Sequence, residues 1–135
     1  MRLDPDLRLR IYEIAGIYAS RFSIPEPKVL LTTREVLDMP REMTEGARTS
    51  AYKYLGLSYN KQNLIFINIR KISNDKDLEN TIVHELIHQR FPYLSHGKRF
   101  NKLVRQGCEE RSFCHIKKEN ELSKNFCLMI YIYNV

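Results

Sequence analysis

The chain has 135 residues, a length that fits one domain, and its 43% hydrophobic and 28% charged residues are typical of a folded globular protein. No apolar run is long enough to cross a membrane, and the first residues lack the apolar core of a secretory signal. We therefore expect an intracellular, cytoplasmic protein with reduced cysteines. The formal net charge of +6 is compatible with weak nucleic-acid contact, or simply with solubility.

The first predicted element is a helix that begins at Pro5. Asp4 is a suitable N-cap residue, proline is favoured at the first helical position, and apolar residues recur from Leu7 to Phe22 at helical spacing. The two prolines within residues 23–27 cannot continue a helical hydrogen-bond ladder, so we expect the helix to end there.

A short strand and a less regular segment follow. Val29–Thr33 is rich in β-branched and aliphatic residues and is the first predicted strand. Arg34–Met39 is predicted as a helical turn, and residues 40–50 as a loop.

A β-hairpin is predicted next. Ala51–Tyr59 and Leu64–Ile69 are rich in Tyr, Leu, Ile and Phe, and residues 60–63 supply the turn between them. Three hairpin tyrosines would lie near the helix that follows: Tyr52, Tyr54 and Tyr59. A tyrosine there could stabilise an oxyanion, but packing is the simpler interpretation, and we assign none of them a catalytic role.

Two helices are predicted after the hairpin. Residues 73–75 offer N-cap candidates for a helix over Lys76–Phe91, and Pro92 ends it. A second helix is predicted from about Gly97 to about Gly107, and it carries Phe100 on its apolar face.

The first of these helices contains the pattern His-Glu-x-x-His. A four-residue spacing returns His84 and His88 to one face of a helix, one turn apart, which suits two nitrogens that bind one tetrahedral zinc. Glu85 lies about 100° further round the helix. From there its carboxylate can reach a metal-bound water without displacing a histidine, as a general base must.

A catalytic zinc needs a third protein ligand and an open fourth position. His96 follows the turn that Pro92 imposes, and Gly97 permits a tight backbone there, so His96 is the predicted third ligand. Chance alone produces the His-Glu-x-x-His pattern in about one chain of this size in a few hundred. The alternative interpretation is a pair of solvated or packed histidines without a metal.

These residues resemble the SprT-like and minigluzincin-type metallopeptidases, which have a minimal zincin fold. The resemblance is carried by Val83–His88 and by Ser95–Phe100, and the preceding order of helix, strand and hairpin is similar. It implies one zinc ion on His84, His88 and His96, with Glu85 as base. In minigluzincins the third ligand is a glutamate, so the resemblance makes Glu109 or Glu110 an alternative to His96. No Cys-x-x-Cys zinc ribbon of the kind found in DNA-binding SprT-like proteins is present.

The predicted fold class is therefore α+β, with a small three-stranded twisted sheet beside the helix that carries the motif. We expect a zincin-like metallopeptidase domain over residues 1–107. Residues 108–135 would form a C-terminal extension packed on that domain, with a β-prone stretch over Phe126–Tyr133.

The predicted function is hydrolysis of peptide bonds by a zinc-activated water, with Glu85 as the general base. The partner would be a protein or peptide substrate, and the chain a monomer or a small homo-oligomer that binds no membrane. The alternative is a zinc-stabilised binding or regulatory module that contacts nucleic acid or a protein and cleaves nothing.

Two features of the C-terminal extension remain open. A second metal site could be formed by Cys108, Cys114, His115 and Cys127, but their spacing matches no standard zinc finger. The β-prone stretch could pair with the edge of the sheet and inhibit the enzyme, although an added structural strand or a dimer contact is the simpler interpretation.

Overall fold

The computed structural model describes residues 1–114, and its side chains over residues 1–107. Within this part the fold is α+β, as predicted, with five α-helices, a three-stranded mixed sheet and three short 3-10 turns. The helices are α1 (Pro5–Arg21), α2 (Thr33–Asp38), α3 (Arg41–Thr44), α4 (Asp75–Arg90) and α5 (Lys98–Cys114). The strands are β1 (Lys28–Leu30), β2 (Gly56–Tyr59) and β3 (Leu64–Ile67).

The sheet has the order β1-β3-β2, with β1 parallel to β3 and β2 antiparallel to it. The predicted hairpin between β2 and β3 is confirmed. Its turn is closed by the Gln62 N–H, which donates to the Tyr59 carbonyl at 3.0 Å. Asn63 has a φ of 48°, a left-handed conformation that asparagine tolerates better than most residues. Because β3 lies between β1 and β2, strand β2 is an edge of the sheet.

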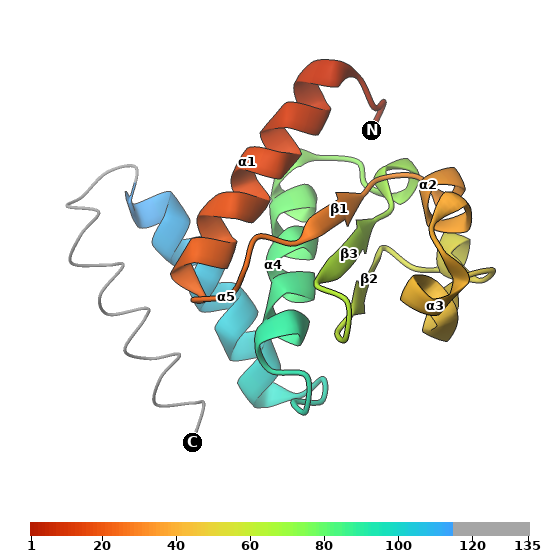
Figure 1. Cartoon of the computed structure of the whole chain (residues 1–135). Coiled ribbons are helices and arrows are strands. Elements are labelled where there is room, and N and C mark those ends of the chain that lie inside the picture. Colours follow the sequence, from red (N-terminus) through yellow and green to blue (C-terminus); the bar gives the residue numbers. More distant parts are fainter. Residues whose placement is uncertain (115–135) are drawn as a thin grey trace.

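Helix α4 is the centre of the fold. It packs against α1, against α5, and against the sheet at β2 and β3 (Figure 1). The N-terminus of α1 is capped as predicted, because the Asp4 carboxylate accepts the Leu7 N–H at 2.8 Å. Tyr18 and Phe22, near the end of α1, are fully buried in the main core.

Both faces of strand β3 are buried, so the sheet separates two apolar clusters. Ile65 and Ile67 belong to the main core with residues of α1 and α4. Leu64 and Phe66 belong to a smaller cluster that includes Val36 of α2 and Ala51. This alternation follows from the two-residue period of a strand. The edge strand β2 is consequently held on one side by a fully buried neighbour.

The predicted strand over Ala51–Tyr59 is too long. Only its second half is a strand, and Ala51–Lys53 forms a 3-10 turn. The reason is a side chain from outside the segment. The Asn68 amide donates to the carbonyls of Tyr52 and Tyr54 at 3.4 and 3.0 Å, so this backbone is not available to a strand ladder.

Both other predicted strands are also too long. The first is Lys28–Leu30 rather than Val29–Thr33, because the Thr32 side chain caps α2, which begins at Thr33. The strand predicted over Leu64–Ile69 ends at Ile67, and Ile69–Lys71 forms a 3-10 turn.

Two further predictions, for a loop and for a helix end, are wrong. The segment 40–50 is not a loop throughout, because α3 and a 3-10 turn at Glu45–Ala47 lie within it, and the Tyr59 hydroxyl donates to the Ala47 carbonyl at 3.0 Å. Helix α5 does not end near Gly107 but continues to Cys114. A glycine inside a helix costs only about 1 kcal/mol relative to alanine. Gly107 is buried, and its carbonyl accepts the Tyr18 hydroxyl at 3.3 Å.

The division of the chain at residue 107 stays a prediction, although α5 passes through it without a break. The β-prone stretch Phe126–Tyr133, with His115 and Cys127, lies outside the described residues. In the described part, no helix has the length and apolar character needed to span a membrane.

Candidate metal centre

Helix α4 presents two different faces, as its sequence predicts. The Asn74 side chain caps it by accepting the Asp77 N–H at 2.8 Å. Ile82 and Leu86 are fully buried, as are the other apolar side chains of the motif segment, whereas His84 and His88 are only partly buried. The core therefore fixes the rotation of the helix and turns both imidazoles toward one side.

The chain then reverses direction and brings the third histidine back to the first two. Helix α4 ends at Arg90, where the Phe91 N–H still donates to Ile87, and the Leu94 N–H donates to the Phe91 carbonyl at 3.0 Å. Pro92 lies inside this turn, where a helix cannot continue. His96 follows the turn directly before α5, so the predicted fold-back of the chain is confirmed.

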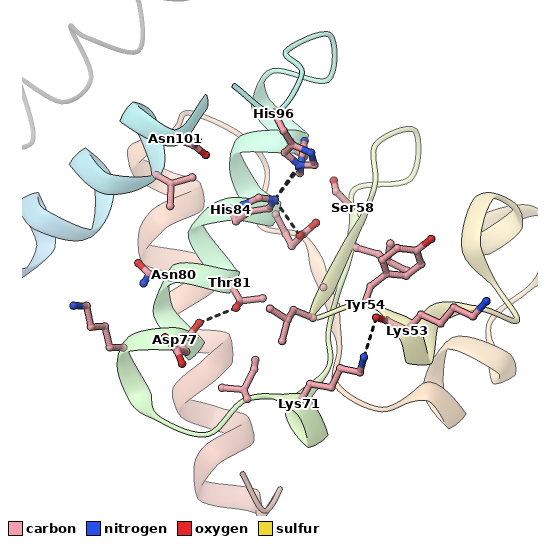
Figure 2. Close-up of a pocket in the computed structure, with 18 of the residues that line it drawn as sticks. Lys53, Tyr54, Ser58, Lys71, Asp77, Asn80, Thr81, His84, His96 and Asn101 are labelled. Atoms are coloured by element: carbon pink, nitrogen blue, oxygen red, sulfur yellow. Dashed lines mark hydrogen bonds and ion pairs between the residues drawn. The ribbon is translucent and has the colours of Figure 1, made fainter. Parts of the chain in front are cut away.

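The three imidazoles meet at one point. The Nε2 atoms of His84 and His96 are 3.1 Å apart, those of His84 and His88 are 3.2 Å apart, and those of His88 and His96 are 2.8 Å apart. Figure 2 shows His84 and His96 facing each other at one end of a pocket. The prediction that these three residues come together is confirmed.

This triangle fits a single metal ion. A tetrahedral zinc with Zn–N bonds of about 2.0–2.1 Å holds its nitrogens about 3.3 Å apart, close to the separations found here. Hydrogen bonds explain the triangle poorly. Each imidazole Nε2 carries either one proton or one lone pair, so three nitrogens at mutual contact cannot satisfy one another fully. Three lone pairs that share one cation have no such conflict.

Burial keeps two of the histidines neutral. It lowers the pKa of His84 to about 4, and His96 lowers it further as a potential positive neighbour. Burial also lowers the pKa of His88 to about 4, with His84 and His96 as the smaller causes. Both side chains are therefore in the neutral form that binds metals at neutral pH.

The Phe100 ring packs against all three histidine rings. It is fully buried, and its ring centroid lies 4.6 Å from that of His84, 4.4 Å from that of His88 and 5.1 Å from that of His96. Leu103, one turn further along α5, is also fully buried. Phe100 therefore contacts the histidine rings directly, whereas Leu103 belongs to the main core.

Glu85 is the acidic residue closest to the cluster in sequence and is nearly buried. Its Oε1 lies 3.9 Å from the Nε2 of His84. Burial raises the pKa of Glu85 to about 8, so in the absence of a cation its proton is held near neutral pH. A positive ion on the histidines would favour the charged carboxylate again.

Glycine at position 56 allows the sheet to approach this glutamate. A Cβ atom on Gly56 would lie 3.0 Å from Glu85 Cγ, 3.0 Å from the Phe66 carbonyl oxygen and 3.1 Å from Thr81 Cγ2. The edge strand and α4 are therefore in direct backbone-to-side-chain contact beside the cluster. No local pattern marks Gly56 in the sequence, because the contact joins positions far apart in the chain.

Gln89 ties the same two elements together one turn further on. Its amide donates to Ser58 Oγ at 2.7 Å and to the Leu64 carbonyl at 3.1 Å. This residue directly follows His88 and was also missed by sequence reasoning, since a glutamine on a helix is usually solvated.

A cleft of about 1200 Å³ lies between β2, α4 and α5 and contains the cluster. Gly56, Leu57 and Ser58 form one wall, and residues of α4 and α5 form the other (Figure 2). Leu55 accepts the Asn68 N–H at 2.8 Å, so the alternation of an antiparallel ladder turns the N–H and C=O groups of Gly56 and Ser58 away from β3. They face outward at the edge of the sheet.

The remaining sequence candidates are not part of the histidine cluster as described. Tyr54 lines the cleft and Tyr52 is exposed. Tyr59 belongs to the smaller core, and burial raises its pKa to about 12. The alternative ligands Glu109 and Glu110, with Cys108 and Cys114, lie on the end of α5, whose side chains are outside the described residues.

Comparisons with known proteins give no relative for this chain. No protein-family model matches it, and neither the search of curated proteins nor that of solved structures found a match. The function must therefore be argued from the site itself.

Proposed function

We propose that the protein is a zinc-dependent peptidase of the SprT-like or minigluzincin type. The observation that carries the proposal is the close triangle of His84, His88 and His96 nitrogens beside a buried carboxylate, in a cleft walled by an edge strand. The order of helix, strand, hairpin and motif helix supports the same family. One zinc ion would be held by the three histidines.

The donor set favours zinc over the commoner hard cations. Three neutral imidazoles suit zinc and other late transition metals, whereas calcium and magnesium bind oxygen ligands. Catalytic zinc sites have three protein ligands and leave one position open. A bound zinc would polarise the substrate carbonyl and acidify a water molecule.

Glu85 would act as the general base. Its carboxylate lies beside the cluster rather than within the triangle, so it can accept a proton from the attacking water. It can then deliver this proton to the leaving amine. Because a zinc ion on the histidines would favour the charged carboxylate, Glu85 would be deprotonated and able to accept this proton.

The outward backbone groups of Gly56 and Ser58 would hold the substrate. A peptide in extended conformation can add to an exposed sheet edge, and its main chain then pairs with such N–H and C=O groups. This pairing would place a peptide bond between β2 and the motif helix, next to Glu85. It requires no particular side chain in the substrate.

The competing assignment is a zinc-stabilised module without activity. A structural zinc site does not need a buried glutamate, whose charged form is unfavourable away from water. Structural zinc sites are also usually closed by four protein ligands. Glu85 is therefore the residue that separates the two functions.

Two substitutions test the proposal. In the Glu85→Gln variant we expect full zinc content by elemental analysis, with peptide cleavage reduced about 100-fold to 10,000-fold, the usual contribution of a general base. In the His88→Ala variant we expect the zinc itself to be lost. Cleavage by the unmodified protein should stop with a chelator and return with added zinc.

Undiminished cleavage by Glu85→Gln would remove Glu85 from the mechanism. Zinc binding without any cleavage, over a broad peptide library, would favour the inactive module.

A further inference from the structure

The cleft has a second chemical feature, because part of its lining is cationic. Among the described residues that line it, the basic ones are Lys53, Lys71, Lys76 and Arg105. The acidic ones are Glu85, which is buried beside the histidines, and Asp77. We call the part of the cleft lined by the three lysines the basic end.

The basic residues lie away from the histidine cluster. Lys53 ends the 3-10 turn before β2, Lys71 ends the 3-10 turn before α4, and Lys76 lies in the first turn of α4. Thr81 and Glu85 of α4 contact the start of β2 at Gly56, and Gln89 reaches Ser58 further along it, so the two elements run side by side. Figure 2 shows Lys53 and Lys71 across the pocket from His96. A bound peptide would meet the lysines on one side of Glu85 only.

The lysines outnumber the one exposed acid among the described residues that line the cleft, Asp77. Its carboxylate accepts the Asn74 side-chain amide at 2.9 Å, a neutral partner, so Asp77 keeps its charge and can offset no more than one of the three lysines. The Lys71 ammonium donates to the Lys53 carbonyl at 2.9 Å, a neutral partner that leaves its charge uncompensated. Lys53 and Lys76 are exposed, and their ammonium groups can therefore meet a ligand at small desolvation cost.

We infer that the cleft selects peptide substrates with acidic residues on one side of the cleaved bond, which are held by Lys53, Lys71 and Lys76. This inference rests on the proposed peptidase function. It favours a peptide over a nucleic acid because the same cleft is walled by the outward N–H and C=O groups of Gly56 and Ser58, which pair with an extended peptide backbone. The attraction between the lysines and an acidic peptide would also increase the rate at which the substrate binds.

The first test measures kcat/KM of the zinc-loaded protein on a matched peptide series. All peptides share one cleavable core, and three glutamates or three glutamines are placed before or after it. Each exposed lysine–carboxylate contact is worth about twofold to fivefold. We expect the glutamates to raise kcat/KM about tenfold over the glutamines on one side of the core only. The gain should shrink as salt is raised.

The second test reverses charges at the basic end. In the double variant Lys53→Glu with Lys76→Glu, the ratio of kcat/KM between glutamate and glutamine peptides should fall to about one or below. Lys71 is left in place because its side chain also holds the backbone at Lys53. Lys28→Glu is the matched control, since Lys28 is exposed on β1 at the opposite edge of the sheet and does not line the cleft. The control should keep the ratio of the unmodified protein.

The third test measures binding without turnover. Fluorescence anisotropy of labelled peptides on the zinc-loaded Glu85→Gln variant should show about tenfold tighter binding of the glutamate peptide than of the glutamine peptide. If the unmodified protein cleaves nothing but this binding preference is present, the peptidase proposal fails and the acidic selection stands.

The opposite outcome is equally distinct. Cleavage with no preference for glutamate on either side would overturn the inference and leave the peptidase intact. A single-stranded DNA oligonucleotide that binds more tightly than the glutamate peptide and displaces it would assign the basic end to nucleic acid, and would also overturn the inference.

Discussion

The two ends of the cleft are built in different ways. At the histidine end, packing of buried side chains sets their orientation. Phe100 contacts all three histidine rings, and the Glu85 side chain packs against the backbone at Gly56. At the basic end, Lys53 and Lys76 are exposed, and the Lys53 ammonium lies 6.0 Å from the centroid of the exposed Tyr52 ring. Chemistry needs groups fixed to within a fraction of an ångström, whereas charge recognition acts over several ångströms. A substitution should therefore act differently at each end.

The largest expected effect comes from Phe100→Ala at the histidine end. Removal of a fully buried phenylalanine costs about 3–5 kcal/mol of unfolding free energy. It also frees the three rings, so we expect zinc affinity to fall about tenfold to 100-fold, as for loss of other groups that orient metal ligands. Denaturant unfolding of the metal-free protein and competition with a zinc-binding dye measure the two effects separately.

Phe100→Leu keeps the variant testable if the alanine protein does not fold. The control is Leu103→Ala, which removes an equally buried side chain one turn further along α5. We expect this control to lose stability but to keep most of its zinc affinity. Equal losses of zinc affinity in both variants would mean that the histidines respond to the core in general and not to the phenylalanine beneath them.

Gly56→Ala should have an intermediate effect and should act on Glu85. The new methyl group would lie 3.0 Å from Glu85 Cγ and 3.0 Å from a backbone oxygen, so the strand or the glutamate must move. Overpacking of this kind typically costs about 1–3 kcal/mol. We expect turnover to fall about tenfold or more while zinc content stays full, because a 1 Å displacement of a catalytic group can cost up to about 100-fold.

A matched control for this substitution lies in the same chain. A Cβ on Gly46 has no neighbour within 4 Å, so Gly46→Ala should leave zinc content and turnover unchanged. If both glycine variants lose turnover equally, the contact between β2 and Glu85 does not position the base.

Local spacing explains why part of the site was predictable from the sequence. His84 and His88 share a helix face because of a four-residue interval, and a helix of this length follows from its cap and its apolar period. His96 was harder, since only the break at Pro92 pointed to a return of the chain. The roles of Glu85 as base and of zinc as the metal stay predictions.

Contacts between distant segments explain what was not predicted. The Asn68 side-chain amide donates hydrogen bonds to two carbonyl groups in the segment before β2, so the strand is shorter than predicted. Gly56 meets Glu85 across 29 positions of sequence, and no local pattern marks such a contact. The basic end was not predicted for the same reason: Lys53, Lys71 and Lys76 come from three separate elements, so no run of positive charge appears along the chain.

The smallest expected effect comes from a residue outside the cleft, Glu35. It tests whether the two ends of the cleft are independent of the rest of the fold. Glu35 joins α2 to α1: its carboxylate accepts the N–H groups of Leu31 and Thr32 at 2.8 Å and the Arg8 guanidinium at 2.8 Å. Burial alone would raise the pKa of Glu35, but these donors hold it below its usual value. The carboxylate therefore stabilises the fold above the unfolded-state pKa of about 4.3, and this contribution is lost as the pH falls through the lower, folded-state pKa.

Glu35→Gln should accordingly lower the free energy of unfolding at pH 7 by no more than about 1 kcal/mol, since the Arg8–Glu35 pair is about a third exposed and screened by solvent. The difference from the unmodified protein should narrow as the pH falls below the unfolded-state pKa of about 4.3, and should be smallest below the lower, folded-state pKa. Urea unfolding at the two pH values measures it. Zinc affinity and the glutamate preference should both be unchanged at pH 7, because Glu35 does not line the cleft. A loss of either one would mean that the packing of α1 against α2 reaches the site through α4, and that the two ends of the cleft are not independent of the rest of the fold.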